Sequence, residues 1–548
     1  MKKQKIEIKA ISAVEKVLAY KTPKNEEYAG VCLTNSRYNF QVALRVQQRL
    51  LQCKIKAESD LGEYIQVREV QTVPVNYAFS ECLPEDKDVI SKKAGAYPDL
   101  LVPLREMGFS LLSEQWKAFY ITVTANDGKL PAGRHELRIL LTNNAGEVLA
   151  KTTYVLEVLS DELPKLPIFN CNWMHYDSIS HWYQVPVWSE EFNKITDTYI
   201  QNLVNHGGNV AFVPLFTPPL DTAVGAERKT VQLVGVTVND GEYIFDFEPV
   251  KAFIRRAQNL GMEYFELSHL FTQWGGTACP KIMANVDGEE KRIFGWDTPS
   301  IGDEYVAFLK AFLPALMTVL DELGVREKTF VHLTDEPNTA HIEQYAKLNA
   351  IVRSLVGDTV VMDALSHYEF HERGLVPMPV VDTGSYDQWA GKCDNFAVYY
   401  CCGTGKGRSN RFIVMPALRT RILGFQVYNA GSAGFLHWGY NFWNAQYSLA
   451  QINPFVDNDA LGAFPAGDGF LVYPGEDGPM DSIRNELMSD AWQDYRLALL
   501  AEKYVGKAAI KKIFADYKLR GMNVYPHSEK KFLQVRARLM QIVSQREL

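Results

Sequence analysis

The sequence lacks the features of membrane-spanning, secreted and disulfide-stabilised proteins. No stretch approaches the roughly 20 apolar residues that a membrane-spanning helix needs. The first residues are basic, but charges recur among them and no apolar core follows, so they do not resemble a secretory signal. The eight cysteines include no Cys-x-x-Cys pair and do not suggest a disulfide framework. We therefore expect a protein of the reducing cytoplasm with no membrane partner.

A long basic run is missing as well. The formal net charge of -8 is spread along the chain and provides no electrostatic footprint for nucleic acid. Low-complexity tracts are absent, and 47% hydrophobic with 22% charged residues is typical of globular protein. A chain of 548 residues exceeds one hydrophobic core, so we expect roughly two to four domain-sized units.

Motifs for several common chemistries are absent too. There is no Gly-x-Ser-x-Gly elbow and no His-Glu-x-x-His motif. His367 and His371 are four residues apart, but a solvated helix face explains them better than a metal site. The glycine-rich segment 402–409 lacks the first glycine of a phosphate loop. We expect neither a cofactor nor a metal ion.

The first part of the chain has the spacing of short strands and turns that is typical of a β-sandwich. Short strand-like segments alternate with turn signals such as Asn143-Asn144-Ala145-Gly146. The polar, proline-marked stretch 160–167 is typical of a linker. The sequence therefore predicts a β-sandwich domain over residues 1–162.

The next part predicts a (β/α)8 barrel of the TIM type over residues 163–505. Short apolar runs alternate there with amphipathic helical stretches, as in a parallel sheet covered by helices. Eight runs are strand candidates: Ile168 to Trp173, Asn209 to Leu215, Tyr264 to His269, Thr329 to Thr334, Thr359 to Ala364, Pro379 to Thr383, Phe396 to Tyr400 and Gly434 to Gly439. A charged helical tail over residues 506–548 is expected to follow.

Two adjacent acids, Asp335 and Glu336, end the fourth of these strands and precede Pro337. Active-site residues of such barrels lie at the C-terminal ends of the strands. A bend at the proline would turn both side chains into one pocket. Two carboxylates held close cannot both ionise freely, so one is expected to stay protonated while the other carries charge. The alternative is that one acid caps the following helix, but the barrel context favours catalysis.

The segment His332-Leu-Thr-Asp335-Glu336-Pro337 resembles the strand-end signature of glycoside hydrolase family 123, the β-N-acetylgalactosaminidases. Further blocks of the chain are similar to that family: Tyr399-Tyr400-Cys401-Cys402, residues 434–443, residues 467–475 with 482–484, and the sandwich segment 115–119. The resemblance implies a sandwich and barrel, and a carbohydrate substrate with β-linked N-acetylhexosamine.

The resemblance also implies a retaining, exo-acting enzyme in which the 2-acetamido group of the substrate is the nucleophile. Glu336 would protonate the departing oxygen and Asp335 would accept the acetamido N–H. Tyrosine hydroxyls commonly hold the acetamido carbonyl in such sites, and Tyr386, Tyr400 and Tyr440 are the candidates. Residues expected to contact the sugar are Trp438, Asn441 and Trp443.

Two other hypotheses remain open from the sequence. A glycosidase acting on a sugar without an acetamido group would need an enzymic nucleophile, such as Asp382 or Glu266, about 5 Å from the acid. A non-catalytic carbohydrate-binding protein could retain the same barrel, because a fold alone does not establish activity.

Overall fold

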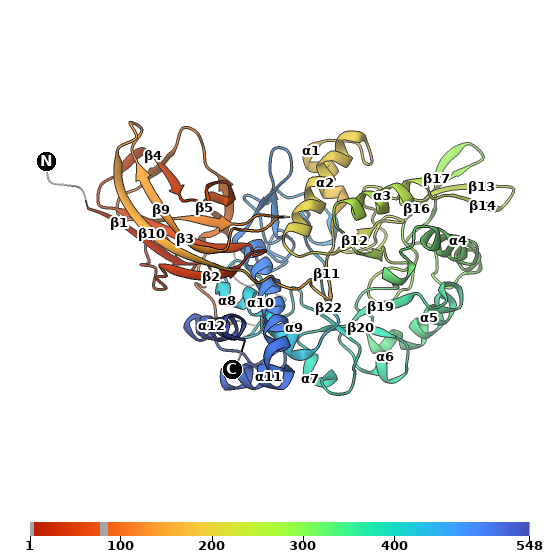
Figure 1. Cartoon of the computed structure of the whole chain (residues 1–548). Coiled ribbons are helices and arrows are strands. Elements are labelled where there is room, and N and C mark those ends of the chain that lie inside the picture. The colour runs from red at the N-terminus through yellow and green to blue at the C-terminus, as the bar shows by residue number, and fades with distance from the viewer. Residues whose placement is uncertain (1–4, 77–85, 127, 547–548) are drawn as a thin grey trace.

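The computed structural model describes residues 5–76, 86–126 and 128–546. Figure 1 shows two sheets formed by the first part of the chain beside a larger region built around a parallel sheet. One sheet has the order β1-β3-β8-β5-β6 and is antiparallel. The other has the order β2-β10-β9-β4-β7, in which β2 and β10 are parallel.

Alternating side chains explain these sheets. In Gly133–Thr142, the buried positions begin as every second residue, so one face of the strand packs inward. Phe40, Phe119 and Tyr154 belong to the buried cluster between the sheets. The strands are β1 (Ile6–Ser12), β2 (Ala29–Leu33), β3 (Tyr38–Val46), β4 (Leu50–Glu58), β5 (Ile65–Val75), β6 (Gly95–Pro103), β7 (Phe109–Leu111), β8 (Trp116–Val123), β9 (Gly133–Thr142) and β10 (Val148–Leu159), with the short helix η1 (Gly62–Tyr64).

Eight parallel strands form a nearly closed barrel, each overlapping one of the segments expected from the sequence. Their order is β11-β22-β21-β20-β19-β18-β15-β12. The end strands meet at two asparagines: the Asn209 N–H donates to the Asn170 carbonyl oxygen (3.2 Å), and the Asn170 N–H donates to Asn209 Oδ1 (2.7 Å). The strands are β11 (Phe169–Asn172), β12 (Val210–Val213), β15 (Tyr264–Leu267), β18 (Thr329–His332), β19 (Val360–Leu365), β20 (Met378–Asp382), β21 (Ala397–Tyr399) and β22 (Gly434–His437).

The strands are short apolar runs because both of their faces are buried. All four residues of β12, β18 and β22 are buried. The helices of the barrel region are α1 (Tyr176–Tyr183), α2 (Glu190–Asn205), α3 (Glu248–Asn259), α4 (Asp303–Glu322), η2 (Arg326–Lys328), η3 (Thr339–His341), α5 (Ile342–Val356), α6 (Glu369–Glu372), α7 (Tyr386–Trp389), α8 (Ala417–Arg421), α9 (Leu423–Ala430), η4 (Gln446–Ser448) and α10 (Ile483–Val505). Two helices, α6 and α7, are single turns, so the alternation of strand and helix is less regular than expected.

Two excursions leave the barrel, and two helices follow it. A four-stranded sheet of order β14-β13-β16-β17 is built from β13 (Gly235–Asn239), β14 (Glu242–Asp246), β16 (Ile282–Val286) and β17 (Glu289–Phe294). The hairpin of β23 (Val472–Pro474) and β24 (Pro479–Asp481) precedes α10. Helices α11 (Lys507–Asp516) and α12 (Glu529–Gln545) follow α10. Among the residues described, no helix is long and apolar enough to cross a membrane.

Helix α10 joins the N-terminal sheets to the barrel. It lies between the two parts in Figure 1, and its first turns carry buried charges that pair with the sheets. Glu486 is fully buried and accepts hydrogen bonds from Arg37 (Nη2 to Oε1, 2.6 Å) and Arg68. Arg484 pairs with Asp99 of β6 (Nε to Oδ1, 2.9 Å). The two parts therefore share a charged, desolvated interface.

Candidate active site

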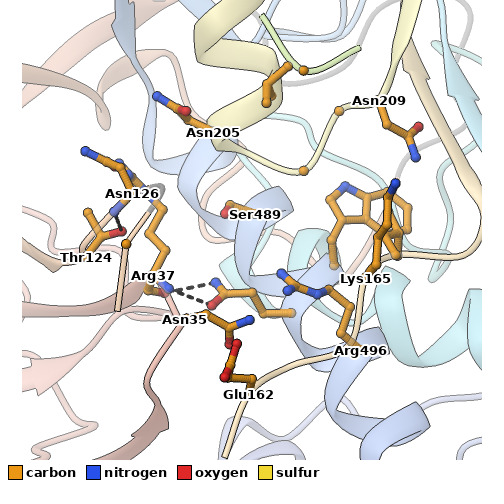
Figure 2. A pocket seen from close by; sticks show the side chains of 18 of the residues that line it. Asn35, Arg37, Thr124, Asn126, Glu162, Lys165, Asn205, Asn209, Ser489 and Arg496 are labelled. Atoms are coloured by element: carbon orange, nitrogen blue, oxygen red, sulfur yellow. Dashed lines mark hydrogen bonds between the residues drawn. The ribbon is translucent and has the colours of Figure 1, made fainter. Parts of the chain in front are cut away.

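Two cavities are candidates for the functional site, and they lie at opposite ends of the barrel. The larger, of about 610 Å³, lies between the N-terminal sheets and the residues that precede β11, β12 and β15. Figure 2 shows the side chains of Arg37, Lys165 and Arg496 around it. Three of its cations already have carboxylate partners: Arg37 pairs with Glu486, Lys129 with Glu162 and Lys165 with Glu263. It therefore shows no grouping of unpaired acids and bases suited to catalysis.

The smaller cavity, of about 190 Å³, lies at the C-terminal ends of the strands and contains the predicted acid pair. This is the end at which barrel enzymes carry their active sites. Its lining residues are Trp173, Leu220, Asp221, Gln273, Trp274, Asp335, Glu336, Ala364, Tyr399, Cys401, Cys402, Leu436, Trp438, Gln446 and Phe464. The smaller cavity is therefore the candidate active site.

A backbone bend after β18 brings both acids to this cavity. Glu336 has φ 47°, in the left-handed region that non-glycine residues rarely adopt. The side chains of Asp335 and Glu336 are both half-buried. The Tyr399 hydroxyl donates a hydrogen bond of 2.5 Å to Glu336 Oε1. Neither acid is the N-cap of the next helix, because the side chain of Asn338 caps η3 by accepting the Ala340 N–H.

The protonation of the pair follows from its surroundings. Burial, followed by the charge of Glu336, raises the pKa of Asp335 well above its usual range. Burial also raises the pKa of Glu336, although the Tyr399 hydroxyl opposes this by stabilising the carboxylate. The two acids titrate together, so the pair retains one proton at a pH where isolated carboxyls have lost theirs. Such a pair can supply an acid and an anion at once.

A buried histidine lies beneath the pair. His332 Nδ1 is 2.9 Å from Glu266 Oε1, and His332 Nε2 is 3.4 Å from Asp363 Oδ1. Burial alone would lower the pKa of His332, but the carboxylates of Asp363 and Glu266 raise it to about 10. The ring therefore carries a positive charge at neutral pH, and this charge favours the ionised form of Asp335.

His332 also belongs to a group of side chains that could hold a metal ion. Possible ligand atoms of His269, His332 and Asp335 lie within 4.8 Å of one another, and neither ring nitrogen of His269 has a hydrogen-bond partner. A protonated His332 has no lone pair to offer, so a metal ion would bind here only by displacing that proton. His332 lies close to the carboxylates of Glu266 and Asp363 and balances their charge.

The structure brings only part of the predicted site together. Asp335, Glu336 and Trp438 line the cavity. Five predicted residues do not line it, because their side chains contact other parts of the protein. The Tyr400 hydroxyl reaches the Met488 sulfur (3.5 Å), and the Tyr440 hydroxyl donates to Asn202 Oδ1 (2.8 Å). The Asn441 side chain forms hydrogen bonds with the backbone of His175, Trp443 Nε1 donates to the Val472 carbonyl oxygen (3.2 Å), and Tyr386 packs on Phe396. The catalytic and binding roles of all the named residues remain predictions.

Sequence reasoning missed Tyr399, which lies one position before the predicted Tyr400. Side chains of consecutive strand residues point to opposite faces. Tyr399 therefore faces the acids, while Tyr400 faces helix α10. The sequence signal that could have identified Tyr399 is its position at the end of a strand, and the same signal applies to Trp173, which follows β11. Asp221, Gln273 and Trp274 lie in loops whose sequence carries no such signal.

The two proposed alternative nucleophiles do not line the cavity. Glu266 is fully buried and accepts hydrogen bonds from Trp173 Nε1 (2.8 Å) and Cys171 Sγ (3.0 Å). Asp382 accepts a hydrogen bond from Thr404 Oγ1 (2.8 Å). Apart from the acid pair, the one carboxylate among the lining residues named above belongs to Asp221.

Comparison with known proteins gives a consistent result. The model of the glycoside hydrolase 123 catalytic domain matches residues 173–500. A family 123 glycoside hydrolase from Clostridium perfringens, whose structure describes glycolipid glycan hydrolysis, has a TM-score of 0.72 at 15% identity, covering 99% of this chain and 97% of its own.

Weaker structural matches include a glycosyl hydrolase family 2 member from Bacteroides cellulosilyticus, with a TM-score of 0.29 and 10% identity, covering 80% of this chain and 48% of its own. A putative beta-galactosidase from Bacteroides fragilis has a TM-score of 0.31 and 10% identity, covering 80% and 57%. No curated protein matches the sequence. Because the catalytic-domain model spans more than half of the chain, the chain belongs to glycoside hydrolase family 123 and is a glycoside hydrolase.

Proposed function

We propose that this glycoside hydrolase is a retaining, exo-acting β-N-acetylgalactosaminidase that uses the 2-acetamido group of its substrate as the nucleophile. The observation that carries the proposal is the adjacent pair Asp335 and Glu336, which share one cavity and whose pKa values burial raises. In this mechanism the enzyme supplies an acid and an orienting anion, and the acetamido oxygen attacks the anomeric carbon.

Substrate binding would redistribute the proton of the pair. In the free enzyme burial raises the pKa of both acids, and the Tyr399 hydroxyl stabilises the carboxylate of Glu336, which leaves the proton on Asp335. An acetamido N–H donating to Asp335 favours its ionised form, and the positive charge of His332 acts in the same direction. The proton then resides on Glu336, which delivers it to the departing glycosidic oxygen.

Tyr399 is the candidate for holding the acetamido carbonyl in place of Tyr386, Tyr400 and Tyr440. Its hydroxyl is at the cavity and already donates to Glu336. Once Glu336 is protonated, that hydroxyl is free to donate to the acetamido oxygen instead. After the oxazolinium ion forms, Glu336 accepts a proton from water, and a second inversion restores the β configuration.

An enzymic nucleophile is the competing mechanism, and Asp221 is the residue that could supply it. Asp221 lines the cavity, and burial raises its pKa to about 6. Its Oδ2 accepts the Tyr447 N–H (3.0 Å), which indicates a structural role. If Asp221 were the nucleophile, Asp221→Asn would abolish turnover and added azide would restore it.

Hydrolysis of 4-nitrophenyl β-glycosides with and without a 2-acetamido group tests the proposal. We expect turnover of the N-acetyl-β-galactosaminide and a loss of about 10²- to 10⁴-fold in Glu336→Gln. The matched control is Glu369→Gln, which alters an exposed acid of α6. Proton NMR should show a β-configured first product, and an α-configured product would exclude the mechanism. Turnover of plain glycosides alone would favour the enzymic nucleophile.

A further inference from the structure

Two aromatic rings remain exposed at the mouth of the cavity. Trp274 is 41% exposed and Tyr447 is 36% exposed, whereas most large aromatic side chains of the described chain are buried. The two rings meet edge to face, with centroids 5.9 Å apart and planes at 88°. Trp274 also lines the cavity with Asp335 and Glu336. An apolar surface is therefore presented to solvent directly beside the acid pair.

Backbone hydrogen bonds fix these rings to the catalytic centre. The Trp274 N–H donates to the carbonyl oxygen of Asp335 (2.8 Å). The Tyr447 N–H donates to Asp221 Oδ2 (3.0 Å), and the Asp221 N–H donates to Gln273 Oε1 (2.6 Å). The loops that follow β12, β15 and β22 are thus joined to one another at the mouth.

Three residues at the cavity mouth have strained backbone conformations. Asp221, Trp274 and Tyr447 have φ values of 41°, 59° and 58°, all in the left-handed region. Such conformations cost free energy and persist where surrounding contacts enforce them, often at ligand sites. A large part of Trp274 remains in water at this position, and a ring stacked on it would bury that part.

We propose that Trp274 and Tyr447 form a leaving-group platform, which stacks on a second sugar ring beyond the scissile bond. The inference rests on the proposed function of the same cavity. A sugar ring has an apolar face and a rim of hydroxyls. The platform offers aromatic surface with the amide of Gln446 and the carboxylate of Asp221 beside it. A longer glycan is therefore the preferred substrate over a simple alkyl glycoside.

The test compares two substrates that share the sugar to be cleaved. One is its methyl β-glycoside, and the other is a disaccharide with a second hexose as leaving group. Trp274→Ala should lower kcat/KM for the disaccharide about tenfold more than for the methyl glycoside. Trp274→Phe, which keeps an aromatic face, should retain part of the preference. Leu449→Ala removes an exposed apolar side chain nearby in sequence and should change neither value.

A binding measurement separates this inference from the proposed function. Calorimetric titration of Glu336→Gln, with and without Trp274→Ala, measures affinity for both saccharides without turnover. A tenfold loss for the disaccharide alone supports the platform, even if acetamido sugars prove not to be substrates. Equal losses for both saccharides, no loss for either, or no binding of any saccharide would overturn it.

Discussion

At the scale of single residues, the acid pair depends on the close approach of two like charges. Asp335 and Glu336 share a half-buried site, where burial and then the charge of Glu336 raise the pKa of Asp335. The Tyr399 hydroxyl and the protonated His332 act against this by favouring the ionised forms. The balance among four side chains sets which acid holds the proton.

Replacing Asp335 with asparagine should shift the pH profile. In the substrate complex the substitution removes the negative charge of Asp335, so the pKa of Glu336 falls, although burial still holds it above its ordinary value. Glu336 acts as an acid only while protonated, and the alkaline limb of kcat, which reports the substrate complex, should therefore move to lower pH. The residual activity of Asp335→Asn on the N-acetyl-β-galactosaminide, measured from about pH 4 to 9, checks this. An unmoved alkaline limb would show that another group controls it.

The residue scale also shows where sequence reasoning succeeds and fails. Asp335 and Glu336 could be predicted because an apolar strand ending in acids and proline is visible in the sequence. The candidates Tyr386, Tyr400 and Tyr440 do not include Tyr399, because the sequence does not show which strand residues face inward. A register error of one position reverses the face of every side chain.

At the scale of elements, α10, the last helix of the barrel region, begins at a clear capping signal. Ser482 Oγ accepts the Asn485 N–H (3.1 Å) and donates to the Leu471 carbonyl oxygen (2.6 Å). Ser482 is fully buried. Helix α10 therefore starts where a side chain both satisfies an amide and fixes the preceding hairpin.

Loss of this cap should be measurable. We expect Ser482→Ala to lower the free energy of unfolding by about 1–2 kcal/mol, because a helix amide and a buried carbonyl oxygen both lose their partner. Urea unfolding followed by circular dichroism gives the value. Ser528→Ala at the start of α12 is the matched control. Its bond to the Lys531 N–H is longer (3.5 Å) and exposed, so a smaller loss is expected. Equal losses would argue against the role of burial.

Strands were predicted more securely than the loops between them. Most of the barrel strands are apolar runs bounded by turn residues, a pattern that follows from burial on both faces, whereas β11 carries two asparagines. The excursion of β13, β14, β16 and β17 was not foreseen, because these strands are partly exposed and carry a weaker signal. The loop residues at the cavity mouth are positioned by tertiary hydrogen bonds, which a sequence does not reveal.

At the scale of the whole molecule, charges buried between the sheets and α10 contribute to stability. Burial alone would raise the pKa of Glu486, but the guanidinium groups of Arg37 and Arg68 hold it well below its usual range. The stabilisation is therefore present above the unfolded pKa of about 4.3 and is lost as the pH falls through the lower folded value.

Neutralising Glu486 should destabilise the entire chain. Glu486→Gln leaves Arg37 and Arg68 without their shared carboxylate, and we expect a loss of about 3–5 kcal/mol in the free energy of unfolding at neutral pH. The difference from the wild type should shrink in acid. Thermal unfolding across pH measures both effects. Glu162→Gln, which breaks an exposed pair with Lys129, should cost under about 1 kcal/mol. A pH-independent difference would contradict the proposed pairing.

The domain boundaries after residues 162 and 505 remain predictions. The buried ion pairs of Glu486 cross the first of these boundaries. Glu486 belongs to the barrel side, and its neutralising arginines belong to the N-terminal sheets. A sandwich without basic side chains at these places would take both guanidinium partners from the Glu486 carboxylate and leave it the imidazole of His206, 3.5 Å away. An unrelated sandwich could therefore replace residues 1–162 without loss of stability only if it supplied matching cations.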